Sequence, residues 1–405
     1  MVEASGASAS AARLLAPARY SLARVLEYPP ERDTQAEEPR IGVFVCHCGS
    51  NIGGYLDVPA VAEEARKLPG VVHAEDNLYT CSQDTIAHII EQVKTLGLNR
   101  VVVASCTPLT HEPLFQDALR QAGINPYLFE MANIRNQCSW VHSSDWEAAT
   151  EKAKRLVRMA VARAARLQPL KTAEVPVNPA ALIIGGGAAG MTVALTLADQ
   201  GFPVHLVERQ AELGGNLRHL RYFAPPDGAQ PALTPQQYLA ETIRRVEQHP
   251  LIQVYLNAEL VDTSGFKGNF TSIVRQGETS FRIQHGVIIV ATGGREYKGR
   301  EYGYGTDKRL LTQLEFEALL SDLEARPGGG ESRRPVPGSV VMIQCVGPAE
   351  KFCSRLCCTT ALKNALKLKE LNPRAEVTVV YHDIRTYGFK ERVYTEARRA
   401  GVRFV

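Results

Sequence analysis

Short, continuous apolar runs alternate with segments of helical periodicity along most of the chain. In the first third, these runs have the length and composition of strands buried on both faces of a parallel sheet. They lie at residues 41–45, 101–104 and 127–129, with a weaker run around 71–73. Helical spacing falls between them, at residues 58–68, 84–96 and 112–122. Strand alternating with helix predicts an α/β domain with a mostly parallel sheet over residues 40–143.

The same alternation continues in the rest of the chain. Further buried strands are predicted at residues 181–184, 203–207, 286–290, 339–343 and 376–381. We therefore expect a Rossmann-like domain over residues 178–335, with a small β-meander near residues 256–274. A partial second dinucleotide-binding-like segment follows over residues 336–405.

Two segments lack this pattern. Residues 1–39 are rich in Ala, Ser, Arg and Glu, and we expect a flexible leader with one short helix over residues 11–26. Residues 144–177 are expected to connect the domains. Within them, the basic and alanine-rich stretch 151–167 predicts a solvated helix.

Composition, net charge and cysteine content exclude several classes of function. The chain has 405 residues, of which 45% are hydrophobic, so it can form ordinary folded cores. A net charge of +3 is too balanced to indicate nucleic acid as a partner. No apolar run approaches the ~18–20 residues that span a bilayer. Nine cysteines, an odd number, indicate metal or redox chemistry in a reducing, cytoplasmic compartment.

A glycine fingerprint follows the strand at 181–184. Gly185, Gly187 and Gly190 match G-x-G-x-x-G, with Ala188 and Ala189 between them, and a helical segment follows at once. The glycines allow a tight turn, a close approach to pyrophosphate, and close packing of helix on strand. Glu208 ends the next strand, where its carboxylate can accept hydrogen bonds from ribose hydroxyls. Strand, glycines, helix and acidic residue together predict a dinucleotide site.

Two later features favour FAD over NAD. Gly214-Gly215 follow the acidic strand end, and the strand at 286–290 leads into Ala291-Thr292-Gly293-Gly294. This order of motifs is typical of flavoproteins that have two dinucleotide-binding domains. Further candidate FAD contacts beside the fingerprint are Arg209, Gly215, Asn216, Val261, Ala291, Thr292 and Gly293.

Five cysteines of the first domain lie in polar loops near the predicted strand ends. Because parallel strands end at one edge of a sheet, we expect four of these thiols to converge on one crevice. The preferred four are Cys46, Cys81, Cys106 and Cys138, with Cys48 as the spare. Four thiolates suit an iron–sulfur cluster or zinc, but the long spacings leave unligated or redox thiols open.

A second cysteine group replaces the glycine fingerprint expected after the strand at 339–343. Cys345, Cys353, Cys357 and Cys358 lie in QCVGPAEKFCSRLCC, and Cys358 opens a helical segment. This density favours a [4Fe–4S] cluster, with zinc or a redox disulfide as alternatives. Without the second fingerprint, we do not expect NAD to bind here in the usual way.

These motifs resemble a known family. They are VCHCGSNIGG, NRVVVASC, HEPLF, NPYLFEMANIRNQCSWVH, LIIGGGAAGMTVALTLADQGFPVHLVER and QCVGPAEKFCSRLCC. With them, the chain resembles the A subunit of heterodisulfide reductase and its relatives in electron-bifurcating complexes, from about residue 40 to residue 405. The resemblance implies a thioredoxin-reductase-like FAD domain, a [4Fe–4S] cluster at each cysteine group, and Lys363 near the flavin. It also implies partner subunits: those of the heterodisulfide reductase B and C types, and an electron donor of the hydrogenase or dehydrogenase type.

The sequence therefore predicts an FAD- and [4Fe–4S]-containing electron-transfer subunit of a heterodisulfide-reductase-like complex. One alternative is a stand-alone FAD/NAD(P)H disulfide oxidoreductase that uses a cysteine pair of the second group. Another is a truncated, non-catalytic assembly subunit, because the family's carboxyl-terminal region does not follow residue 405. On that expectation, another chain completes the FAD fold or the sequence is truncated.

Overall fold

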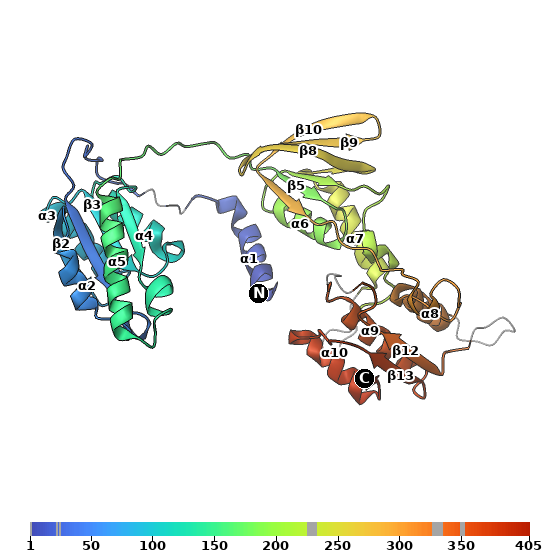
Figure 1. Ribbon diagram of the computed structural model, residues 1–405. Helices are drawn as coiled ribbons and strands as arrows, with labels where there is room; N and C mark the ends of the chain where they lie inside the picture. The colour runs from blue at the N-terminus through green and yellow to red at the C-terminus, as the bar shows by residue number, and fades with distance from the viewer. Residues whose placement is uncertain (1, 22, 24–25, 225–232, 326–334, 349–352) are drawn as a thin grey trace. The chain divides into compact units, whose positions relative to one another are not determined.

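The computed structural model describes residues 2–21, 23, 26–224, 233–325, 335–348 and 353–405 (Figure 1). The chain divides into two compact units. The first unit is Ala23–Glu174, and the second combines Met1–Leu22 with Val175–Val405. Among the described helices, none has the length and apolarity needed to cross a membrane.

A four-stranded parallel sheet forms the centre of the first unit. Its order is β2-β1-β3-β4, with bounds β2 (Val71–Asn77), β1 (Ile41–Cys46), β3 (Arg100–Ser105) and β4 (Phe129–Asn133). Strands β1 and β3 are buried along their whole length, as expected of the two central strands. The predicted parallel α/β architecture is confirmed.

Helices cover both faces of this sheet. They are α2 (Val58–Ala65), α3 (Gln83–Thr95), α4 (Pro108–Gln121) and α5 (Trp146–Ala164). One face packs α2 and α5 against Val43 and Val45, and the other packs α3 and α4 against Phe44. The alternation of side chains along β1 produces these two separate cores.

Helix α5 differs from the solvated connecting helix that we expected. One of its faces is buried in the core of the first unit, through Ala149, Thr150, Ala153, Val157, Ala160, Val161 and Ala164. Small residues at helical spacing let α5 approach the sheet closely, while its basic residues lie on the other face. The first unit therefore continues beyond the boundary at residue 143 that we expected.

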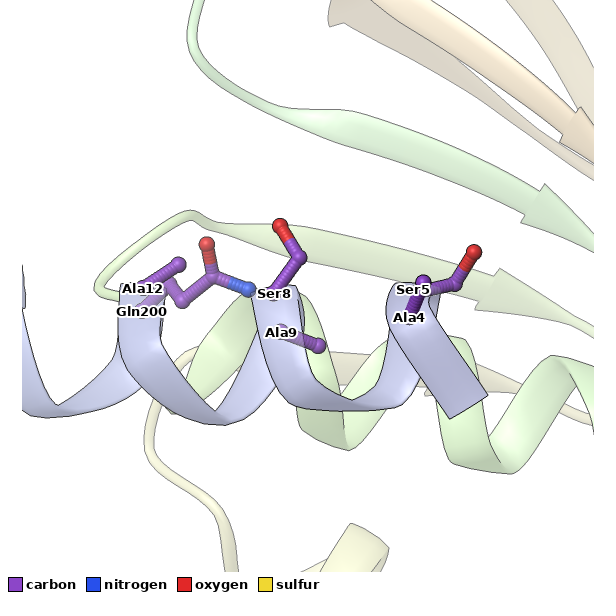
Figure 2. A pocket seen from close by; sticks show the side chains of 6 residues that line it. All are labelled: Ala4, Ser5, Ser8, Ala9, Ala12 and Gln200. Atoms are coloured by element: carbon purple, nitrogen blue, oxygen red, sulfur yellow. The ribbon is translucent and has the colours of Figure 1, made fainter. Parts of the chain in front are cut away.

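The leader segment also differs from the flexible tail that we expected. Thr34 is fully buried, and the Arg32 N–H donates to Gly123 O at 2.8 Å within the first unit. The first helix, α1 (Val2–Leu15), begins well before residue 11. Within the second unit, Arg13 of α1 lies 3.5 Å from Asp199, and small side chains of α1 face Gln200 (Figure 2).

The second unit begins with a parallel sheet of order β11-β5-β6-β7. Its strands are β11 (Val287–Val290), β5 (Ala181–Ile184), β6 (Val204–Val207) and β7 (Ile252–Tyr255). Helices α6 (Ala188–Ala198) and α7 (Pro235–Gln248) pack on it. An antiparallel meander of β8 (Ala258–Phe266), β9 (Asn269–Gln276) and β10 (Thr279–His285) follows β7.

A smaller parallel sheet forms the carboxyl-terminal part of this unit. Its strands are β12 (Ser339–Ile343), β13 (Glu376–Val380) and β14 (Arg403–Phe404). Helices α8 (Gln313–Ala325), α9 (Cys357–Leu371) and α10 (Glu391–Arg399) share its core. The start of a further strand, predicted at residues 401–405, is β14.

Candidate functional site

The glycine loop lies at the carboxyl end of β5. The Gly185 N–H donates to Val207 O at 2.8 Å, and its φ of 109° requires glycine. A Cβ on Gly190 would overlap the Gly185 carbonyl oxygen, whereas a Cβ on Gly187 would meet no atom within 4 Å. The loop therefore packs tightly on its inner side and leaves space on its outer side. That space adjoins the amino terminus of α6, which favours an anion such as pyrophosphate.

Glu208, at the end of β6, stabilises this loop through hydrogen bonds. Its side chain is buried, and its two carboxylate oxygens accept from the N–H groups of Gly186 at 2.7 Å and Gln210 at 2.8 Å. The carboxylate therefore holds the glycine loop against the second strand. Its contact with a ribose stays a prediction.

The other glycine-containing loops meet at the same end of the sheet. The Ala291 N–H donates to Ile184 O at 2.8 Å, and Gly214 pairs with Gly187 in an isolated bridge. The Asn216 Nδ2 donates to Gly294 O at 2.8 Å. The structure thus brings three predicted FAD-binding loops together.

Most of the remaining candidate FAD contacts are exposed at or beside these loops. They are Ala188, Ala189, Arg209, Gly215, Thr292 and Gly293. Val261 is also exposed, but it lies on β8, where the pairing with β9 is irregular between Leu260 and Asp262. Its contact with FAD stays a prediction.

Four cysteines of the first unit line one cavity of about 80 Å³. Cys46 ends β1, Cys81 lies just before α3, and Cys106 follows β3. Cys48, which we expected to be the spare, is the fourth. The complete lining is Cys46, Cys48, Ile52, Cys81, Ser105, Cys106, His111 and Arg135. Because β1 and β3 are parallel neighbours, their following loops meet at one edge of the sheet.

These thiols are close enough to affect one another. Burial raises the pKa of Cys48, the neighbouring Cys46 thiol raises it further, and the Arg135 guanidinium opposes the rise. Burial likewise raises the pKa of Cys81, with Cys46 and Cys106 adding to the effect. Gathering four such groups is unfavourable for free thiolates. A bound cation or cluster would stabilise the deprotonated forms.

Cys138 does not line this cavity. It lies in a π-helical turn (Arg135–Ser139), is fully buried, and its Sγ donates to Ala149 O at 3.0 Å on α5. Burial raises the pKa of Cys138 to about 11. We expected a ligand because Cys138 follows a strand end, but its side chain packs in the hydrophobic core.

The second cysteine group is only partly gathered in the described residues. Cys357 and Cys358 open α9, and the Cys357 thiol donates to Cys358, which lowers the pKa of Cys358 and raises that of Cys357. Cys353 adds to the rise at Cys357. The Arg385 N–H donates to Cys358 Sγ at 3.5 Å from the loop after β13. Cys345 follows the neighbouring strand β12, so it starts from the same edge of that sheet.

Lys363 lies one turn further along α9, in a buried polar cluster. Its Nζ lies 2.7 Å from the Glu317 carboxylate on α8 and donates to Tyr222 O at 3.1 Å. Burial lowers the pKa of Lys363, and the Glu317 contact opposes that change. The described contacts of the ammonium are therefore structural, and its proximity to flavin stays a prediction.

Buried polar atoms without a hydrogen-bond partner among the described residues occur beside both cysteine groups. In the first unit they include the hydroxyls of Thr80 and Ser105, each directly before a cysteine. In the second unit they include Gln344, Thr359 and Thr386. Other unpartnered atoms among the described residues of the first unit lie on Thr34, His73, Asn77 and Arg100, so those beside the cysteines are compatible with a further bound group without indicating one on their own.

Within the described ranges, no three Cys, His, Asp or Glu side chains already form a metal-binding arrangement. The fit of a metal therefore depends on donor chemistry: four thiols on one cavity, with a buried hydroxyl beside them. That donor set suits iron–sulfur and zinc centres. Sequence analysis named Cys48 only as the spare and did not single out Ser105 or Arg135, which also line the cavity. The C-x-C spacing after β1 was the available signal for Cys48.

We compared this chain with protein families, solved structures and curated proteins. Residues 183–258 match the NAD(P)-binding Rossmann-like domain family. Among solved structures, a thioredoxin reductase from T. acidophilum is 13% identical and has a TM-score of 0.34, covering 56% of this chain and 64% of that one. A likeness this weak supports no inference.

Two curated relatives are much more similar. One is the A subunit of the H(2):CoB-CoM heterodisulfide,ferredoxin reductase of Methanothermobacter thermautotrophicus, which is 35% identical over 466 aligned positions, covering 93% of this chain and 70% of the relative. The other is an iron-sulfur A subunit of the CoB–CoM heterodisulfide reductase of Methanopyrus kandleri, which is 36% identical, covering 91% of this chain and 68% of the relative. The alignments are longer than this chain, so the relatives contain internal residues that it lacks. At this identity and coverage, the chain belongs to the family of heterodisulfide reductase A subunits, which are oxidoreductases.

Proposed function

We propose that this chain is an electron-transfer subunit that holds FAD in its second unit and a [4Fe–4S] cluster at each cysteine group. The observation that carries the proposal is the convergence of Cys46, Cys48, Cys81 and Cys106 on one cavity, in a chain that also has the glycine loop. Four thiolates that converge from separate loops suit an iron–sulfur cluster, which is the reading that we favour over zinc.

The residues of the second unit suit FAD. The open side of Gly187 and the amino terminus of α6 would accept the pyrophosphate. Gly215 and residues 291–293 would line the approach to the flavin ring. When bound, FAD exchanges electron pairs and iron–sulfur clusters exchange single electrons, so the chain would link two-electron and one-electron chemistry.

We further propose that the chain works within a multi-subunit complex. The relatives are named as subunits, and three of the names give heterodisulfide and ferredoxin together before the word reductase. By analogy, partner subunits of the B and C types and a hydrogenase- or dehydrogenase-type donor would exchange electrons with this chain. Bifurcation of an electron pair between two acceptors is part of the same proposal.

Anaerobic purification, with flavin, iron and sulfide quantified, tests the proposal. We expect one FAD and about eight irons per chain, four for each cluster. Zinc in place of iron at both cysteine groups would overturn the electron-transfer proposal. Reduction of the flavin by NADH in an iron-free protein would instead support a stand-alone disulfide oxidoreductase.

A further inference from the structure

Ser105 occupies an unusual position beside the first cysteine group. It is the last residue of β3, directly before Cys106, and only 3% of it is exposed. It lines the same cavity as the four thiols. Its hydroxyl has no hydrogen-bond partner among the described residues.

This hydroxyl is not needed to complete the sheet. The Ser105 carbonyl already accepts from the Ile134 N–H at 2.9 Å, and the residue pairs with Asn133 on β4. Among the other buried hydroxyls of the same unit, those of Thr34 and Thr80 also lack a partner among the described residues, but neither lines the cavity, whereas two others have partners. Ser139 Oγ donates to Asn51 O at 2.6 Å, and Thr150 Oγ1 donates to Trp146 O at 2.8 Å.

Leaving a buried hydroxyl without a partner costs about 1–3 kcal/mol. A core position at the end of β3 could be filled by alanine without that cost, as Ala104 fills the preceding position. A partner that enters the cavity would remove the cost. Four thiols line the cavity together with Ser105, beside the polar side chains of His111 and Arg135. Because thiols are the most numerous polar groups there, the partner that we expect is a group bound by them, which would bring sulfur atoms to the hydroxyl.

We propose that the Ser105 Oγ–H donates a hydrogen bond to a sulfur atom of the cluster held by Cys46, Cys48, Cys81 and Cys106, and so raises its reduction potential. The inference rests on the proposed function, which supplies the cluster. Reduction adds negative charge to the sulfur atoms, and a hydrogen-bond donor stabilises that charge. Hydrogen bonding to the sulfurs is one of the means by which proteins set cluster potentials.

The test uses the full chain, purified anaerobically with its cofactors, and a reductive titration followed by electron paramagnetic resonance. The signal of the first-unit cluster is identified by its loss in Cys48→Ala. In Ser105→Ala we expect that signal at a lower potential, with the equilibrium constant for one-electron reduction lowered about tenfold, which is 59 mV. Iron content and the signal of the second cluster should not change.

Thr150→Val is the matched control. It removes a buried hydroxyl of the same unit that has protein partners and does not line the cavity. We expect it to lower stability and leave the cluster potential unchanged. An equal shift of potential in Thr150→Val and Ser105→Ala would overturn the specific role of Ser105.

If Ser105→Ala loses its iron, its cluster potential cannot be measured, so a second pair of variants is compared instead. Threonine and valine have nearly the same shape and differ in the hydroxyl, so Ser105→Thr should have a higher cluster potential than Ser105→Val. Equal potentials in that pair, or an unchanged potential in an iron-loaded Ser105→Ala, would overturn the inference and leave the proposed function intact. Absence of iron from the first unit of the unmutated chain would overturn both.

Discussion

The two cysteine groups of this chain are gathered in different ways. The first comes from separate loops between residues 46 and 106, yet its four thiols line one cavity. The second is confined to residues 345–358, where Cys358 and Cys353 both raise the pKa of Cys357. A long separation in sequence is therefore no obstacle to a shared site, because the topology of a parallel sheet brings distant loops to one edge.

The loops that carry these cysteines also differ in backbone strain. In the first group, the His47 N–H donates to Asn77 O at 2.8 Å, and Ser139 Oγ donates to Asn51 O, which fixes the loop around Cys48. In the second group, Cys345 and Arg355 have left-handed φ values of 58° and 61°. Such conformations cost roughly 1–2 kcal/mol per non-glycine residue. The first site is therefore preorganised by the protein, whereas the second is strained.

The largest expected effect comes from Cys48→Ala, which removes a thiol that we place in the first site. We expect about four irons per chain to be lost, the content of one [4Fe–4S] cluster, with the second cluster retained. Iron and sulfide analysis of the anaerobically purified variant measures this.

Cys138→Ala is the matched variant at the cysteine that the structure places in the core. It should keep full iron content and cost about 1 kcal/mol of stability, for one buried sulfur and one hydrogen bond. The opposite outcome, with iron lost in Cys138→Ala and kept in Cys48→Ala, would restore the ligand set expected from the sequence.

The fold predicted from the sequence is confirmed, whereas the first ligand set stays a prediction, of which the structure brings Cys46, Cys81 and Cys106 to one cavity with Cys48 in place of Cys138. Strands such as β1 and β3 are continuous apolar runs, and the glycine loop has a local pattern, so both can be recognised without a structure. The choice between Cys48 and Cys138 depends on side-chain direction. Whether a thiol after a strand turns to the cavity or to α5 is decided by packing far along the chain, here by Ala149.

The role of α5 illustrates the same limit. Its alanine-rich face is consistent with both a solvated helix and a closely packed one, because alanine is a good helix former in either setting. The sheet face that α5 covers is built from β1 and β3, which precede it by many residues. Tertiary packing therefore decides between the two, and the local sequence does not contain that information.

The next largest effect is expected on flavin affinity, from a substitution in the glycine loop of the second unit. In Gly187→Ala the added methyl projects into open space, so the fold should persist while the pyrophosphate site is obstructed. We expect flavin affinity to fall by about tenfold or more, at about 1.4 kcal/mol per factor of ten. Fluorescence of released FAD during anaerobic gel filtration measures it.

Gly190→Ala is the contrasting variant for this loop. Its Cβ would overlap the Gly185 carbonyl oxygen, so the strand and helix must separate and the unit should lose stability as well as flavin. Full flavin content in Gly187→Ala would show that the dinucleotide does not bind at this loop.

The ion pair between α9 and α8 should affect the free energy of unfolding, with a smaller effect on cofactor content than the variants above. Lys363→Met leaves the buried Glu317 carboxylate without its cation, which should cost about 3–5 kcal/mol. Adding Glu317→Gln should recover much of that loss, because the unpaired charge is then removed. The free energies of unfolding of the single and double variants, measured in urea, give the coupling energy between Lys363 and Glu317. Unchanged stability with an altered flavin potential would instead place the Lys363 ammonium at the flavin.

Removal of iron should have the smallest effect on the fold of the first unit. Its two cores bury both faces of β1 and β3 with apolar side chains, so its folding does not depend on metal as that of small zinc domains does. After anaerobic chelation, we expect far-ultraviolet circular dichroism to change little and this unit to stay resistant to trypsin.

The strained second group should relax after chelation, because the bonds from its cysteines to a cluster would no longer offset the cost of the left-handed backbone at Cys345 and Arg355. Cleavage after the exposed Arg355 should then accelerate, with peptides identified by mass spectrometry. Faster cleavage of the first unit than of residues 345–358 would reverse the order of preorganisation inferred for the two sites.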